Sequence, residues 1–272
     1  MIYKELPVHP DYPENTMTLF VHDEDDTVRP AVVVFPGGGY HFLSAREAEP
    51  VARFYYDAGF HVFLHRYSVG EAAKNHMPAV QGGLCIRYIR EHAEELRVDP
   101  DRIFTCGFSA GGHAAASTGV YWNHPVVRDA LGVTDGSAPE GINRPNGMIL
   151  CYAVLTAGEK THMGTARRAC GHEVPTEEDI REYSVEQNVD ATTPPAFLWH
   201  TFSDGSVPIE NAIFMMDAMA KHKVPFEAHI FPEGPHGLSL CNEQTWEGKK
   251  DLLNPHAAVW ADLSVKWIRD CF

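Results

Sequence analysis

The sequence has few features that would suggest an oxidised, secreted protein. Its six cysteines, at positions 85, 106, 151, 170, 241 and 271, form no Cys-x-x-Cys pair. Cys106 and Cys151 lie inside apolar runs, where a free thiol packs as a small hydrophobic group. We therefore expect a reduced, cytoplasmic chain without a disulfide framework.

Positive charge is also scarce. The chain has 22 Lys and Arg against 37 Asp and Glu, a formal net charge of −15, and no run of Lys or Arg longer than a pair. Nucleic acids and anionic membranes bind clustered positive charge, so we expect neither as a partner. No apolar stretch is long enough to span a bilayer, and the first residues do not resemble a secretory signal. The composition suits a small neutral substrate and leaves a homo-oligomer open.

Recognisable metal-binding spacings are missing as well. The 16 histidines show no His-Glu-x-x-His or comparable pattern. We therefore expect no metal and no other cofactor, with the histidines spread over core and surface.

Strands and helices alternate from residue 30 onward. Short apolar runs predict strands over 31–36, 60–67, 102–106, 147–153, 196–201 and 226–231. Helical spacing predicts helices over 46–58, 78–96, 208–222 and 256–269. This order predicts an α/β protein with a mainly parallel central sheet and helices on both faces. Because 272 residues suit one such domain, we expect a single domain over 1–272.

One region interrupts the alternation. Residues 155–194 are rich in Gly, Thr, His and charged side chains, and only 176–183 has a helical pattern. The segment falls between two predicted strands and is long for a plain connection. We expect a small cap or lid over the site, with a surface excursion as the alternative.

Gly107-Phe108-Ser109-Ala110-Gly111 is the most informative stretch of the chain. It follows a predicted strand and leads into a predicted helix, the setting of the nucleophile elbow in α/β-hydrolases. In this arrangement the serine sits on a sharp turn, and glycines let strand and helix approach closely. The helix N-terminus then faces the place where an oxyanion forms. Ser109 is therefore the predicted nucleophile.

A serine nucleophile needs a base and an acid that orients the base. In α/β-hydrolases the chain order is Ser, then Asp or Glu, then His. Asp204 follows the predicted strand 196–201, and His236 follows the strand 226–231, so both lie at carboxyl ends of strands. We predict a Ser109–His236–Asp204 triad. Glu233 is the rival acid, and Asp204 as a turn or cap residue is the structural alternative.

Three consecutive glycines follow the first predicted strand, at Gly37, Gly38 and Gly39. Glycines cost chain entropy on folding, so their presence here indicates that backbone N–H groups approach a ligand closely. We predict an oxyanion hole formed by Gly38 and Gly39 together with Ala110, the residue after the nucleophile.

Together these motifs give a family resemblance. Pro36-Gly-Gly-Gly-Tyr40, Arg46–Ala52, Gly107–His113, Thr193–His200 and the segments of Asp204 and His236 resemble the acetyl-xylan-esterase-like branch of α/β-hydrolase esterases. The match covers about residues 30 to 240. Pro36 stands where hormone-sensitive-lipase relatives have His in His-Gly-Gly-Gly, which leaves the backbone donors intact. The resemblance implies an α/β-hydrolase fold with the triad named above.

The predicted function is a serine carboxylesterase that removes acetyl groups from sugars or xylo-oligosaccharides. Tyr40 and Tyr152 are candidate aromatic contacts for a sugar ring, whereas Trp199 is expected in the core. The alternatives are an esterase, lipase or arylformamidase acting on small non-sugar acyl compounds, and a non-catalytic binding protein of this fold. A prolyl-oligopeptidase-like peptidase would need an additional β domain, for which the chain has no room.

Overall fold

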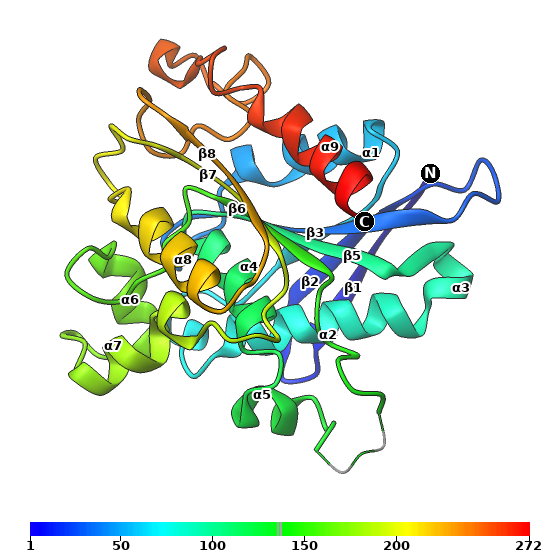
Figure 1. Ribbon diagram of the computed structural model, residues 1–272. Helices are drawn as coiled ribbons and strands as arrows, with labels where there is room; N and C mark the ends of the chain where they lie inside the picture. The colour runs from blue at the N-terminus through cyan, green and yellow to red at the C-terminus, as the bar shows by residue number, and fades with distance from the viewer. Residues whose placement is uncertain (135, 137) are drawn as a thin grey trace.

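An eight-stranded sheet forms the centre of the computed structural model, which describes residues 1–134, 136 and 138–272 (Figure 1). The strand order is β1-β2-β4-β3-β5-β6-β7-β8. The pairs from β4 to β8 are parallel, whereas β1–β2 and β2–β4 are antiparallel. The strands are β1 (Ile2–His9), β2 (Tyr12–Val21), β3 (Arg29–Phe35), β4 (His61–Arg66), β5 (Val98–Phe108), β6 (Gly147–Cys151), β7 (Ala196–Thr201) and β8 (Phe226–Phe231).

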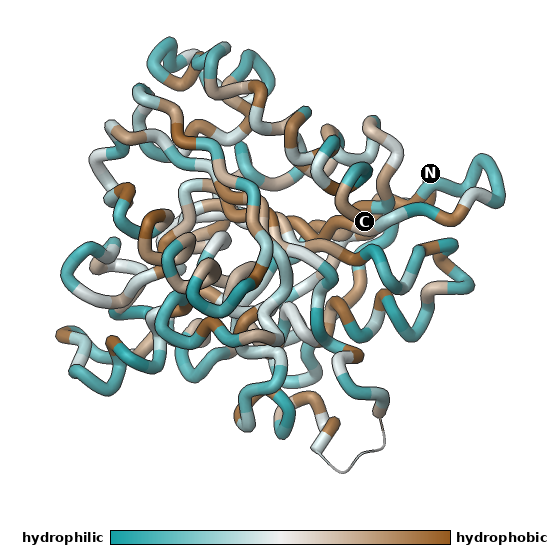
Figure 2. The backbone as a smooth tube through the Cα atoms, in the orientation of Figure 1, coloured by the Kyte–Doolittle hydropathy of each residue, from teal (hydrophilic) through white to brown (hydrophobic). Residues whose placement is uncertain are grey.

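Helices cover both faces of the sheet. Helices α1 (Glu49–Asp57) and α9 (Trp260–Cys271) pack on one face, and α2 (Met77–Glu91), α4 (Ala110–Val120) and α8 (Glu210–Lys221) on the other (Figure 1). Shorter elements are α3 (Ala93–Leu96), α5 (Pro125–Ala130) and the 3-10 turns η1 (Ala45–Glu47), η2 (Gly70–Ala73) and η4 (Lys250–Leu252). Figure 2 shows the apolar colour concentrated on the central strands. Two buried apolar clusters, one on each side, confirm the predicted α/β layering.

The N-terminal strand pair was not expected from the sequence. Most residues of β1 are exposed, and β2 is steadily buried only in its second half. Such edge strands carry polar residues, so their apolar pattern is weak. The register of β2 against β4 pairs Thr18 with Leu64, and through this pairing the N-terminus extends the predicted sheet.

The segment 155–194 connects β6 to β7 and contains α6 (Met163–Cys170), α7 (Glu177–Tyr183) and η3 (Val185–Asn188). Helix α7 matches the pattern seen at 176–183, with Thr176 and Asp179 forming a capping box. Helix α6 was missed because its N-cap is His162, an unusual capping residue. Helix α6 contacts α7, and η3 contacts both α4 and α8.

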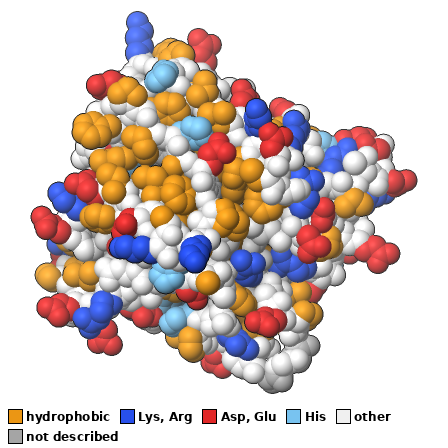
Figure 3. Space-filling model, in the orientation of Figure 1, with side chains coloured by type: hydrophobic (Ala, Val, Ile, Leu, Met, Phe, Trp, Pro, Cys, Tyr) orange, Lys and Arg blue, Asp and Glu red, His pale blue; other side chains and the backbone are white. Residues whose placement is uncertain are grey.

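The face shown in Figure 3 carries many hydrophobic side chains, gathered in its upper left part and centre. Charged side chains of both signs surround them. Among the described residues, no helix combines the length and apolar character needed to cross a membrane.

Candidate active site

Ser109 occupies a strained turn between β5 and α4. Its φ and ψ are 54° and −119°, a conformation that a residue with a side chain rarely adopts. Its backbone N–H donates to the carbonyl of Cys151 over 3.0 Å, and its carbonyl accepts from the N–H of Val154. These two bonds fasten the turn to the end of β6. A Cβ at Gly111 would lie 2.2 Å from the carbonyl oxygen of Phe35, so only glycine fits where α4 approaches β3.

The structure brings the three predicted residues together. His236 Nε2 lies 2.8 Å from Ser109 Oγ, and His236 Nδ1 lies 2.7 Å from Asp204 Oδ2. The side chain of Asp204 is fully buried, whereas that of His236 is 22% exposed. The imidazole thus touches both partners and keeps one edge open to solvent, the geometry of a base positioned to take the serine proton.

Asp204 is held by more than its contact with His236. Its Oδ1 accepts hydrogen bonds from the backbone N–H groups of Ser206 and Val207, at 2.8 and 2.9 Å. Burial alone would raise the pKa of Asp204, but interactions with His200 and His236 and the backbone bonds outweigh it and hold that pKa below its usual range. The carboxylate is therefore ionised at neutral pH. The carboxylate that contacts Nδ1 of His236 is that of Asp204 and not that of the rival acid Glu233.

The glycine turn, residues 37–39, lies directly beside Ser109. A Cβ at Gly37 would lie 3.1 Å from Cβ of Ser109, and the N–H of Gly37 donates to Glu47 Oε2 over 2.9 Å. Gly38 has a φ of 129°, and its carbonyl accepts the N–H of His41. Within the described part of the chain, no backbone carbonyl accepts the N–H groups of Gly38 and Gly39. Both remain available to a bound oxygen, as does Ala110 N–H at the start of α4.

Neither predicted aromatic contact presents a ring face to a ligand. Tyr40 is 1% exposed and its hydroxyl lies 2.8 Å from Nδ1 of His113. Tyr152 is 2% exposed and donates its phenolic hydrogen to Glu47 Oε1 over 2.7 Å. The structure therefore corrects the expectation that these side chains contact a sugar. Both residues follow strand ends, where tight packing of the flanking loops buried them.

Tyr152 has a supporting position instead. Its ring packs edge-on against the ring of His236, with centroids 5.1 Å apart, and its hydroxyl accepts the N–H of Ser239. One phenol thus connects the histidine loop to Glu47, which in turn holds the glycine turn.

Two residues of the 155–194 segment reach the glycine turn and were missed in the sequence. Arg168 extends toward the carbonyl of Gly39, and a Cβ at Gly39 would lie 3.4 Å from Cε1 of His162. Burial, followed by the neighbouring His236 and the positive charge of Arg168, lowers the pKa of His162, so its ring is neutral at pH 7. Nδ1 of His162 accepts the N–H of Thr165, which leaves the proton on Nε2. No spacing rule could have indicated these contacts, since they cross about 125 residues of chain.

Comparison with known proteins places this site in a family. The family model described as BD-FAE matches residues 17–219. The chain belongs to the BD-FAE family. This BD-FAE protein is 32% identical over 237 residues to endo-1,4-beta-xylanase B of Butyrivibrio fibrisolvens, and 27% identical over 235 residues to an acetylxylan esterase of Xylanibacter ruminicola. The matches cover 84% and 85% of this chain but 35% and 45% of those proteins, so it spans less than half the length of either.

Solved structures extend the comparison. The BD-FAE protein resembles the acetyl ester-xyloside bifunctional hydrolase from Caldicellulosiruptor lactoaceticus with a TM-score of 0.82 and 30% identity, covering 98% of this chain and 96% of the other. A carboxylesterase from Lactobacillus plantarum gives 0.84 and 28%, covering 100% and 98%. The predicted α/β-hydrolase fold and the acetyl-xylan-esterase-like resemblance are confirmed, and the protein is placed among the hydrolases of this superfamily.

Proposed function

We propose that this BD-FAE protein is a serine carboxylesterase that removes acetyl groups from sugars or xylo-oligosaccharides, with Ser109, His236 and Asp204 as its triad. The observation that carries the proposal is the continuous contact from Ser109 Oγ through the imidazole of His236 to Asp204 Oδ2, at 2.8 and 2.7 Å. The contact with Asp204 strengthens the proposal, because the acid of a triad fixes the tautomer and the orientation of the histidine.

The first step is attack on the ester. His236 Nε2 accepts the proton of Ser109 Oγ as that oxygen bonds to the acyl carbonyl carbon. The negative charge moves to the carbonyl oxygen, where N–H groups of Ala110 and of Gly38 or Gly39 donate to it. The carbonyl then re-forms as the bond between the acyl carbon and the alcohol oxygen breaks, and the protonated imidazole next to Asp204 gives its proton to that oxygen. The alcohol leaves, and an acyl-serine remains.

The second step returns the enzyme. Water takes the place of the alcohol, His236 removes its proton, and the resulting oxygen attacks the acyl-serine carbonyl. The same N–H groups stabilise the second tetrahedral intermediate. Collapse breaks the bond to Ser109 Oγ, which regains its proton from His236, and the carboxylic acid leaves. No step requires a group beyond this chain and water.

Support for a sugar as the alcohol comes from the relatives and from two exposed rings. Phe42, just after the glycine turn, is 58% exposed, and Phe202, two residues before Asp204, is 69% exposed. Exposed aromatic rings on loops that contribute to a site are suited to ligand contact. Both named relatives and the Caldicellulosiruptor enzyme carry xylan or xyloside chemistry in their names.

Acetate release tests the proposal. Acetylated xylo-oligosaccharides, p-nitrophenyl acetate and p-nitrophenyl butyrate would be given to the wild type, to Ser109→Ala and to the matched control Ser117→Ala, a buried serine of α4. We expect sugar deacetylation by the wild type and Ser117→Ala, and a loss of at least about a thousandfold in Ser109→Ala. Turnover of nitrophenyl esters alone would retain the triad and reject the sugar. Full activity of Ser109→Ala would reject the mechanism.

A further inference from the structure

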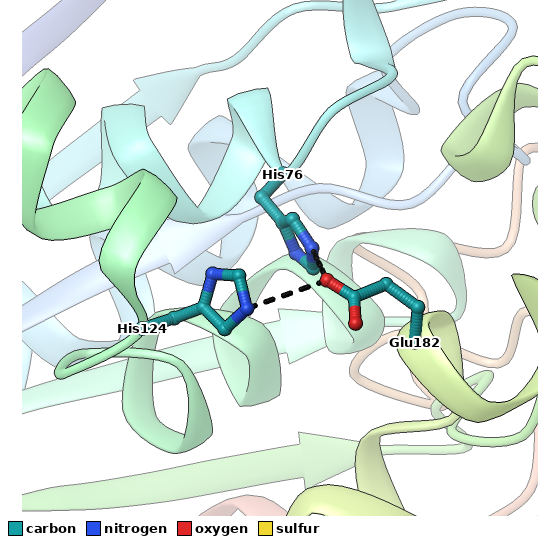
Figure 4. A group of neighbouring side chains, drawn as sticks. All are labelled: His76, His124 and Glu182. Carbon is teal, nitrogen blue, oxygen red and sulfur yellow. Dashed lines mark hydrogen bonds and ion pairs between the residues drawn. The ribbon is translucent and has the colours of Figure 1, made fainter. Parts of the chain in front are cut away.

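A second cluster of polar side chains lies outside the proposed reaction. His76 precedes α2, His124 precedes α5, and Glu182 belongs to α7 in the 155–194 segment. Figure 4 shows the three side chains pointing toward one another from these separate elements. His76 Nε2 lies 2.7 Å from Glu182 Oε1, and His124 Nε2 lies 3.4 Å from the same oxygen.

These distances are close to those of a zinc site. One ligand atom from each residue lies within 4.8 Å of the others. Ligands of a tetrahedral Zn²⁺ stand about 2.0–2.2 Å from the ion and so roughly 3.3 Å from one another. The separation of His124 from Glu182 already has this value. The shorter contact, 2.7 Å between His76 and Glu182, would reach the same separation if the partly exposed side chain of Glu182 moved by roughly 0.6 Å.

The imidazoles are held in place before any ion arrives. The ring of His76 stacks on Tyr183 with centroids 4.9 Å apart and packs edge-on against Tyr121 at 4.8 Å. Tyr121 also donates its hydroxyl hydrogen to the backbone carbonyl of Glu182, which fixes α7 against the end of α4. Among the described residues, Nδ1 of His124 has no polar partner, so the only polar contact of that ring is toward Glu182.

The cluster is also reachable from solvent. The side chains of His124 and Glu182 are 27% and 41% exposed, so the cluster opens to solvent on one side. An ion would therefore have a path to the cluster, and solvent would supply a water as its fourth ligand.

We propose that His76, His124 and Glu182 bind one divalent transition-metal ion, Zn²⁺ by preference, and thereby fasten the 155–194 segment to the body of the fold. Two imidazoles and one carboxylate suit zinc, whereas Mg²⁺ and Ca²⁺ prefer sites made of oxygen. The sequence expectation of no metal rested on local spacing, and these ligands are separated by 48 and 58 residues, from 76 to 124 and from 124 to 182.

A neighbouring cluster serves as the internal control. Cys170, His172 and Asp179 also lie close together in the 155–194 segment. Oδ2 of Asp179, however, already accepts the backbone N–H and hydroxyl of Thr176 and contacts His172 Nδ1 at 2.8 Å. That carboxylate acts as the N3 residue of a capping box, and binding an ion would disrupt the start of α7.

Isothermal titration of the full chain, first treated with EDTA, tests the proposal. Zn²⁺, Co²⁺ and Mg²⁺ would be titrated at pH 7.5 into the wild type, His124→Ala, Glu182→Gln and the control Cys170→Ala. We expect one equivalent of Zn²⁺ to bind, visible absorption of four-coordinate Co²⁺, and no heat from Mg²⁺. Affinity for Zn²⁺ should fall at least about tenfold in His124→Ala and in Glu182→Gln and stay unchanged in Cys170→Ala.

A melting experiment adds a structural readout. Saturating Zn²⁺ should raise the Tm of the wild type and of Cys170→Ala, because the ion binds the folded chain, and should leave the Tm of His124→Ala unchanged. Absence of zinc binding by the wild type would overturn the proposal. Binding retained at full affinity in both ligand variants, or lost in Cys170→Ala, would overturn it equally.

Discussion

Tyr152 donates its hydroxyl hydrogen to Glu47, and through this bond the loop of His236 is connected to the glycine turn. The O–O distance is 2.7 Å, and the same phenol oxygen accepts the N–H of Ser239. The other carboxylate oxygen of Glu47 accepts the N–H of Gly37. The proposed base and the proposed oxyanion donors therefore depend on one buried hydrogen-bond network. The residues of this network come from segments that are far apart in the sequence.

Tyr152→Phe should weaken both the fold and the reaction. Removing the hydroxyl leaves the Glu47 carboxylate and the Ser239 N–H short of a partner, which should lower the free energy of unfolding by about 1.5–3 kcal/mol. We expect kcat to fall about tenfold, because the histidine loop and the glycine turn lose their connection. Urea unfolding and ester kinetics measure the two effects. Tyr55→Phe is the matched control, since that buried hydroxyl bonds Ser264 elsewhere in the core. Equal losses of kcat in both variants would contradict the network's special role.

Asp204→Asn should abolish most activity while the protein stays folded. The amide in place of the carboxylate oxygen can donate to Nδ1 of His236, which selects the wrong tautomer, and it cannot stabilise the imidazolium. A loss on the order of ten-thousandfold in kcat is expected. Steady-state kinetics with p-nitrophenyl acetate measure it, and circular dichroism checks the fold. Activity within tenfold of wild type would point to another acid.

His162 should influence substrate binding, because its ring lies beside Gly39 and carries its proton on Nε2. His162→Asn retains a good N-cap for α6, so stability should change by less than about 1 kcal/mol. The shorter amide no longer reaches as far, and kcat/KM for the sugar ester should drop about tenfold. Met163→Ala, at an exposed position, is the control. If thermal unfolding changed but kcat/KM did not, His162 would be only a capping residue.

Acid should destabilise the protein through its buried histidines. Burial lowers the pKa of His65 and of His113 to about 4, from an ordinary value of 6.5. Between pH 6.5 and 4 these two histidines bind protons in the unfolded chain but stay neutral in the native state. The free energy of unfolding therefore falls as the pH drops through this range. Each group contributes up to about 1.4 kcal/mol per pH unit.

Urea titrations at pH 7, 6, 5 and 4 measure this slope. His65→Phe removes one of the two groups, and its ring can keep the edge-on contact with Phe35. The variant should therefore lose less stability between pH 6.5 and 4 than the wild type. A slope unchanged by the substitution would show that His65 is protonated in the native state.

The sequence determined much of this protein through local signals. The strand-turn-helix pattern around Ser109 depends on residues within about ten positions, and glycines at 107 and 111 are required by contacts that any tight elbow makes. Asp204 and His236 were predictable because parallel strands bring their carboxyl ends to one edge. Weakly patterned edge strands such as β1 gave no comparable signal.

Other features were decided by the tertiary structure alone. Tyr40 and Tyr152 are of a residue type that often contacts ligands. The loops around them bury both rings, and their hydroxyls bond His113 and Glu47 instead. His162 reached the glycine turn, and His76, His124 and Glu182 met, only when distant segments folded together. A local sequence pattern reflects the preference of its residues for a helix, a strand or a turn. Contacts between residues a hundred positions apart depend instead on how whole elements pack. The meeting of Ser109, His236 and Asp204 could therefore be predicted from the chain, and the side chains that support and surround them could not.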